Sequence, residues 1–372
     1  MLELSTNDKK QLEGLNISVE QVERQVNQFK TGFPYSDLIA PATIGNGIIK
    51  FSDTEVQELI KQFDEDKQYY DILKFIPASG AASRMFKNLY SFVEEYEGKE
   101  IPQDFLHKEN IKTDSVEFFF VNIRDFAFYD DLKHNMAEHG KDINTLLNEN
   151  KLTDIAEFLL ENKGLGYGKL PKALLKFHRY KETSRYALEE HLVEAAQYST
   201  ADTEEGIVAQ LHFTVSQEHL NIFKKVVEEV VPRYEEQFGI RYDISYSVQK
   251  PSTDTVAVDM NNEPFRNNDG SLLFRPGGHG ALIQNLNDLH KEIIFIKNID
   301  NVVPDRLKQT TYDYKKVLGG YLFKLQQQQF EYLNLLDEGC LVDDELDEIA
   351  KFAKGEENKE VFEKMKLTGK CR

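Results

Sequence analysis

Cysteine is scarce in this chain of 372 residues, and tryptophan is absent. The two cysteines, Cys340 and Cys371, are too few for a disulfide framework or a cysteine-based zinc site, so a reducing compartment is expected. The first residues, MLELSTNDKKQ, have no basic segment followed by an apolar one, and no apolar run is long enough to cross a membrane. We therefore expect a cytoplasmic protein without a membrane partner.

Positive charge is also in deficit, with 45 lysines and arginines against 64 acidic residues and a formal net charge of −19. Nucleic acids and acidic membranes need a broad positive surface on their partner, so the sequence excludes them as expected partners. A small phosphate ligand needs only a few local cations and stays compatible. The histidine, cysteine and carboxylate positions show neither a metal-ligand spacing nor a nucleophile–histidine–aspartate grouping. Nothing in the sequence indicates the oligomeric state.

The length allows two or three structural modules. Residues 1–70 are predicted to be an N-terminal helical segment, with capping-box starts at Ser18 and Ser52. Residues 71–304 alternate between strand and helix patterns, which predicts an α/β domain with a mostly parallel mixed sheet and helices on both faces. Residues 305–372 are predicted to be a helical C-terminal segment.

Apolar runs and helical periodicity give the expected elements of the α/β domain. Strands are expected around 72–77, 116–121, 207–214, 242–249, 255–259 and 293–298. Helices are expected around 84–96, 142–162, 184–198, 217–231 and 281–289.

The first chemically informative stretch is FIPASGAASRMFK, Phe75 to Lys87. An apolar run that ends in small residues predicts a buried strand, then a loop and a helix. In this small-residue loop, backbone N–H groups can approach a triphosphate closely, and the following helix N-terminus adds a favourable partial charge. Arg84 would bind phosphate oxygens with two parallel hydrogen bonds. Taken alone, the stretch fits equally well a plain strand-to-helix turn with a surface arginine. The loop residues are Ser79, Gly80, Ala81, Ala82 and Ser83.

The second stretch is the glycine-rich turn PGGHG, whose candidate residues are Gly277, Gly278, His279 and Gly280. Bare glycine backbone lets a flat base lie against it. A helix pattern and an apolar strand follow, and the strand ends in Asp300. In α/β sheets ligands gather at the carboxyl ends of strands, and Mg²⁺ is commonly held by one or two carboxylates and by substrate phosphates. By itself, His279 would more often be a capping or packing residue.

The first stretch resembles the signature of the sugar-phosphate nucleotidyltransferase superfamily, roughly L-A-G-G-x-G-T-R-M followed by P-K. Gly80 matches the second glycine, and Ser83 and Arg84 match the threonine and arginine. Ser79 and Ala82 replace the first and third glycines.

The P-K part resembles the later stretch LPKALL, residues 170–175. The resemblance makes Lys172 the lysine that contacts nucleotide phosphates and residues 88–168 an insertion within the motif. The alternative is that Lys172 only solvates the edge of a strand.

The second stretch is similar to motifs of the UDP-sugar and UDP-N-acetylhexosamine pyrophosphorylase branch. In that branch P-x-G-H-G lines the nucleotide pocket, and the aspartate of N-x-D-N binds Mg²⁺. Here the corresponding residues are 276–280 and Asp300. Gln249, in VQKP, resembles a glutamine near the base. Ala281 departs from the pattern, because an acidic residue usually follows the last glycine.

The resemblance implies a GT-A-like fold in a bacterial family of unknown function within this superfamily. The implied activity joins a nucleoside triphosphate, expected to be UTP, to a sugar 1-phosphate and releases pyrophosphate, with Mg²⁺ at Asp300 and with Arg84 and Lys172 as the catalytic residues. The alternative is a nucleotide or nucleotide-sugar binding or regulatory protein without the chemistry. The altered glycines, Ala281 and the missing sugar-recognition strands after Asp300 motivate it. The sequence leaves open whether the chain is truncated, and it does not indicate which base or which sugar is used.

Overall fold

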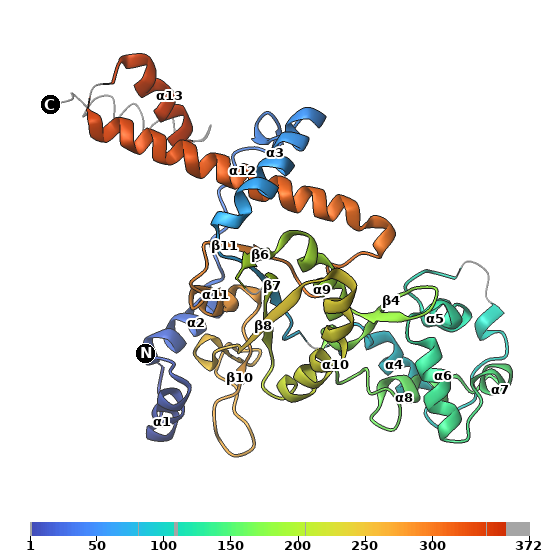
Figure 1. Ribbon diagram of the computed structural model, residues 1–372. Helices are drawn as coiled ribbons and strands as arrows, with labels where there is room; N and C mark the ends of the chain where they lie inside the picture. The colour runs from blue at the N-terminus through green and yellow to red at the C-terminus, as the bar shows by residue number, and fades with distance from the viewer. Residues whose placement is uncertain (1, 81, 108–110, 205, 340, 355–372) are drawn as a thin grey trace. The chain divides into compact units, whose positions relative to one another are not determined.

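The computed structural model describes residues 2–80, 82–107, 111–204, 206–339 and 341–354 (Figure 1). The chain divides into two compact units. The larger unit combines Met1–Gly32 with Tyr70–Lys308, and the smaller unit combines Phe33–Tyr69 with Gln309–Arg372. The N-terminal stretch 1–70 therefore contributes to both units.

The larger unit is built on a mixed sheet in which most strand pairs are parallel. Strands β11, β3, β7 and β8 are hydrogen-bonded side by side in that order and are parallel, and β6 pairs with β7 antiparallel. All six residues of β3 are buried, as expected for a strand that is covered on both faces. The predicted mixed α/β class is confirmed. The strands are β3 (Ile72–Pro77), β6 (Thr200–Thr203), β7 (Gly206–Val215), β8 (Arg241–Val248) and β11 (Ile293–Ile296).

The strand order contains a topological switch point. The chain passes from β3 through β7 to β8, and it then returns to the opposite side of β3 as β11. The direction of winding therefore changes between β3 and β11. In parallel sheets such a point leaves a crevice outside the carboxyl ends of the two strands, where ligands commonly bind.

Helices contact both faces of this sheet. Helices α9 (Ala187–Tyr198) and α10 (Leu220–Phe238) share one buried core with the sheet, through Leu192 of α9 and Phe223 of α10. On the other face, Asn285 of α11 (Ile283–Asn287) donates a hydrogen bond to Ser247 Oγ of β8 at 2.8 Å. Helices α9 and α10 thus lie on one face of the sheet, and α11 lies on the other.

The described residues between β3 and β4 form the α-helices α4 to α8 (Figure 1). These helices have a separate, aromatic-rich core. The predicted strand 116–121 is wrong, because these residues form helix α5. Ser115 Oγ accepts a hydrogen bond from Phe118 N and so caps the helix, and the adjacent Phe119 and Phe120 are both buried, whereas a strand would point them to opposite faces. The helices are α4 (Lys87–Tyr96), α5 (Val116–Val121), α6 (Tyr129–Glu138), α7 (Ile143–Asn148) and α8 (Leu152–Leu160).

Two smaller substructures complete the larger unit. Helices α1 (Thr6–Leu15) and α2 (Val19–Thr31) form a small core with β9 (Thr255–Val256) and β10 (Phe274–Arg275). Ser18 caps α2 as expected, because its side chain accepts a hydrogen bond from Gln21 N. A hairpin of β4 (Lys176–Arg179) and β5 (Ser184–Tyr186) precedes α9.

The smaller unit joins two distant stretches of the sequence. Its elements are β1 (Thr43–Ile44), β2 (Gly47–Ile48), α3 (Asp53–Asp66), the part of α12 (Asp305–Glu338) that follows Lys308, and α13 (Asp343–Lys354). The complete capping box predicted at Ser52 is present. Phe63 of α3 stacks on Phe323 of α12 with ring centroids 5.6 Å apart. None of the helices in the described part of the chain is long and apolar enough to cross a membrane.

Candidate functional site

The small-residue loop that follows β3 is held against the LPKALL segment. The amide N of Lys172 donates a hydrogen bond to Gly80 O at 3.2 Å, and the amide N of Ala82 donates one to Leu170 O at 3.3 Å. Gly80 and Ser83 are exposed, Ser79 is half-buried and Ala82 is buried. Lys172 therefore lies beside the Gly80 loop, despite the long segment between them in the sequence.

Lys172 also reaches the end of β11. Its Nζ donates a hydrogen bond to Asp300 Oδ2 at 2.6 Å, and 27% and 33% of the two side chains are exposed. Burial by itself raises the pKa of the Asp300 carboxyl, but the hydrogen bond and charge of Lys172 lower the pKa below its usual value, with a smaller contribution from His279. Three stretches that are distant in sequence therefore meet at the switch point between β3 and β11.

The backbone that carries Asp300 is fixed by neighbouring groups. The amide N of Ile299 donates to Pro77 O at 3.3 Å, which extends the pairing of β11 with β3. His191 Nε2, on helix α9, donates to Ile299 O at 3.1 Å. His191 is fully buried, and burial lowers the pKa of its imidazole, so its ring is neutral at physiological pH. The position of Asp300 is therefore coupled to α9.

Helix α9 also carries buried carboxylates, which sequence reasoning missed. Glu194 accepts hydrogen bonds from Lys74 Nζ at 3.0 Å and from Lys297 Nζ at 2.7 Å. Glu190 accepts one from Lys308 Nζ at 2.5 Å. The signal was present in the sequence, because Lys74 interrupts the otherwise apolar run of β3 and a buried lysine needs a partner of opposite charge. These ion pairs tie both ends of the segment 297–308, and with it Asp300, to one helix.

The glycine-rich turn lies beside the end of β8. Gln249 Nε2 donates a hydrogen bond to Gly277 O at 3.1 Å, so these two predicted residues are brought together. Gly278, His279 and Gly280 are exposed.

The face of the sheet that meets α11 carries two buried oxygen atoms without a hydrogen-bond partner in the described part of the chain. They are Thr214 Oγ1, at the end of β7, and Asn285 Oδ1. The amide group of the same asparagine donates to Val248 O at 2.9 Å, one residue before Gln249. Buried oxygens of this kind usually bind water or a ligand.

Arg84 is the predicted residue that the structure does not bring to this cluster by any contact among the described residues. Its side chain is exposed and lines a shallow depression of about 290 Å³ beside helix α4, together with Ser83, Lys87, Tyr90 and Glu94. Ala81, another predicted loop residue, lies outside the described residues.

The residues at the switch point fit only one kind of metal site. Among the described residues there is no group of three or more histidine, cysteine or carboxylate side chains that could hold a metal ion. Asp300 offers a single carboxylate. That donor set is too small for a protein-only site, but it fits Mg²⁺ that takes its other ligands from phosphates and water.

Comparison with known families gives one match. The family model described as a domain of unknown function (DUF4301) matches residues 5–371, and the chain therefore belongs to this family. Searches of curated proteins and of solved structures found no match.

Proposed function

We propose that this member of the DUF4301 family joins a nucleoside triphosphate, expected to be UTP, to a sugar 1-phosphate and releases pyrophosphate. The observation that carries the proposal is the ion pair between Lys172 and Asp300 beside the Gly80 loop. Lys172 offers a positive charge for phosphate oxygens, and Asp300 offers a carboxylate for a metal ion bound to those phosphates. Both lie beside a loop of small residues at the switch point of a mostly parallel sheet.

In the proposed reaction, a phosphate oxygen of the sugar 1-phosphate attacks the α-phosphorus of the triphosphate. A new P–O bond forms, the bond to the β-phosphate oxygen breaks, and pyrophosphate leaves with that electron pair. No covalent intermediate with the protein is needed, so the protein contributes positioning and charge neutralisation. When bound at Asp300, Mg²⁺ would neutralise negative charge on the phosphate oxygens.

The ion pair suits this role because Lys172 keeps the Asp300 carboxylate charged in the free protein. The pKa of Asp300 lies below its usual value, so the carboxylate is ionised at physiological pH and loses its charge only as the pH falls through that lowered value. Lys172 can exchange the carboxylate for a phosphate oxygen when a nucleotide binds. Arg84 would add a second cation from the loop.

The glycine-rich turn supports a place for the base. Gly278 and Gly280 are exposed, and a Cβ atom built on either one would have no atom within 4 Å. A planar base could therefore approach their backbone. Gln249 holds the turn through its hydrogen bond to Gly277 O, and Asn285 Oδ1 has no hydrogen-bond partner among the described residues.

Thermal-shift measurements on the full chain with UTP, CTP, ATP and GTP test the proposal, each with and without Mg²⁺. We expect stabilisation by UTP that increases with Mg²⁺. Asp300→Asn should remove the Mg²⁺-dependent part. Lys172→Met should weaken UTP binding about 10- to 100-fold, the scale of one charge-assisted hydrogen bond. Lys169→Met, which alters an exposed lysine of the same segment, should bind UTP like the wild type.

A second candidate function is nucleotide binding without turnover. The sparse donor set favours it, because Asp300 belongs to no group of three or more histidine, cysteine or carboxylate side chains among the described residues. An assay of pyrophosphate release with a panel of sugar 1-phosphates separates the two functions. Release with any of these sugars supports the transferase, and UTP binding without release across the panel supports the binding protein.

A further inference from the structure

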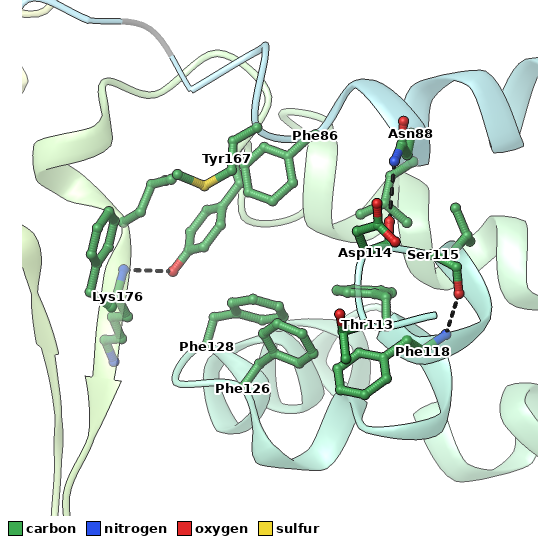
Figure 2. A pocket seen from close by; sticks show the side chains of 16 residues that line it. Phe86, Asn88, Thr113, Asp114, Ser115, Phe118, Phe126, Phe128, Tyr167 and Lys176 are labelled. Atoms are coloured by element: carbon green, nitrogen blue, oxygen red, sulfur yellow. Dashed lines mark hydrogen bonds between the residues drawn. The ribbon is translucent and has the colours of Figure 1, made fainter. Parts of the chain in front are cut away.

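A second cavity lies among the helices between β3 and β4. Its volume is about 460 Å³, and helices α4 and α5 and the start of β4 contribute to its wall (Figure 2). This volume is within the range of small-molecule sites and is far larger than the voids that normal side-chain packing leaves. None of the residues proposed to bind nucleotide lines it.

The wall of this cavity is mainly aromatic. Phe126 and Phe128 stack with ring centroids 5.2 Å apart, and Phe128 meets Tyr167 edge-on at 5.5 Å. Phe86 packs against Tyr167 from the other side at 6.2 Å. Figure 2 shows these rings around an open space, with the polar residues Thr113 and Asp114 on the side away from Tyr167. Because the rings support one another, the apolar surface is formed before a ligand arrives.

The charges around the cavity do not suit an anion. Lys176 is the one basic residue among the described residues of its wall, and its Nζ already pairs with Asp131 at 2.5 Å. Tyr167 Oη accepts a hydrogen bond from the backbone N of Lys176. The carboxylate of Asp114 is exposed and has no hydrogen-bond or ion-pair partner in the part of the chain that the structure describes. A neutral or cationic ligand is therefore favoured over a phosphate.

We propose that this cavity is a second binding site, for a small neutral or cationic molecule with an aromatic body and a hydrogen-bond donor directed at Asp114. The aromatic walls would pack against the body, and the carboxylate would accept the hydrogen bond. The inference is independent of the proposed nucleotide chemistry, because the two sites share no residue. The cavity nevertheless lies close to the loop. Met85 follows Ser83 by two residues and Leu175 follows Lys172 by three, and three residues span at most about 10 Å.

Three probes with the same naphthalene ring but different charge test the charge preference: 1-naphthylmethanol, 1-naphthylmethylamine and 1-naphthyl phosphate. The chain has no tryptophan, so probe fluorescence anisotropy can be measured with excitation beyond the tyrosine absorption. We expect the alcohol and the amine to bind the full-length protein and the phosphate to bind at least about tenfold more weakly, because no unpaired cation lines the cavity. Equal affinity for all three probes, or tighter binding of the phosphate, would overturn the proposal.

Two valines of helix α5 provide a matched test of the location. Val116 lines the cavity, whereas Val121 does not and is 52% exposed. Val116→Phe should fill space in the cavity and weaken binding of the amine at least about tenfold, while Val121→Phe should leave it unchanged. Equal effects of the two variants would place the probe elsewhere.

Asp114→Lys gives a further test that does not alter the apolar wall. This exposed substitution should reverse the preference from 1-naphthylmethylamine to 1-naphthyl phosphate. An unchanged preference would contradict the role of Asp114, even if Val116→Phe fails to fold. Thermal shift with UTP on the same variants reports the nucleotide site separately, so failure of one proposal can be distinguished from failure of the other.

Discussion

At the residue scale, the glycines of the PGGHG turn have different surroundings and should respond differently to substitution. A Cβ atom on Gly277 would lie 2.7 Å from Thr253 O, whereas one on Gly278 would meet nothing within 4 Å. Gly277→Ala should therefore lower the melting temperature of the free protein, because the turn must move away from a backbone carbonyl. Gly278→Ala should leave that temperature unchanged but weaken UTP binding, if the base lies on this backbone. Differential scanning fluorimetry with and without UTP measures both effects.

An equal loss of stability in both variants would contradict the distinction between a packing glycine and a ligand-facing glycine. Gly280→Ala is the matched control for the effect on stability, because Gly280 is exposed and a Cβ atom there would also meet nothing within 4 Å. Its free protein should be as stable as the wild type.

Some residues of the site could be predicted from the sequence, and others could not. The expectation that Asp300 lies near the Gly80 loop follows from the sheet, because the carboxyl ends of the parallel strands β3 and β11 meet at one edge. The place of Lys172 beside both came from the resemblance of LPKALL to the superfamily motif. Arg84 follows the same motif, but its exposed side chain has no contact with Lys172 or Asp300 in the described structure. A motif fixes the course of the backbone more firmly than the direction of a long surface side chain.

At the element scale, helix α9 connects the sheet to the candidate site through buried charge. Burial raises the pKa of Glu194, but the positive charges of Lys74 and Lys297 hold it well below the usual value. Glu194→Gln should destabilise the larger unit by about 3–5 kcal/mol at neutral pH, because Lys74 is left buried without its counter-charge. Urea unfolding measures the loss.

The double variant Lys74→Met with Glu194→Leu should regain much of this loss, since apolar side chains of similar size can replace a buried ion pair. A double variant as unstable as Glu194→Gln would show that the pair is needed for more than charge balance.

The contribution of Glu194 to the free energy of unfolding should depend on pH. The pKa of Glu194 is lower in the folded protein than in the unfolded chain, where a glutamate has a pKa of about 4.3. The ionised side chain therefore stabilises the fold above about pH 4.3, and this stabilisation is lost as the pH falls toward the pKa of the folded protein. Glu194→Gln should flatten that acid-induced loss.

Helices and strands could be predicted where the sequence shows a single clear hydrophobic pattern. The strands β3, β7, β8 and β11 were expected near their observed positions. For β3 and β11 the pattern was a short apolar run, which is typical of buried parallel strands, whereas β8 alternates between more and less exposed residues along most of its length. Helix α5 was missed because a run of three phenylalanines favours a strand by propensity, whereas the Ser115 cap and a surrounding helical core decide the outcome. Tertiary packing overrode local preference at that point.

At the scale of the whole molecule, the chain forms two compact units, and the smaller one depends on contacts between distant stretches of sequence. Lys316 of α12 pairs with Asp64 of α3 at 2.8 Å, and Gly320 packs directly on the backbone of Leu59. This arrangement could not be predicted from periodicity. Both helices have amphipathic patterns, but such a pattern does not show which other element the apolar face packs against.

The close approach of α12 to α3 gives the last prediction. A Cβ atom on Gly320 would lie 2.1 Å from Leu59 O, so Gly320→Ala should separate the helices and destabilise the smaller unit by about 1–3 kcal/mol. Hydrogen exchange should then quicken in α3 and α12, while the UTP response of the larger unit stays unchanged. Gly14→Ala is the matched control, because Gly14 lies in helix α1 and a Cβ atom there would meet nothing within 4 Å. This variant should be slightly more stable than the wild type, because alanine favours a helix more than glycine does. Unaltered exchange in α3 after Gly320→Ala would disprove this packing.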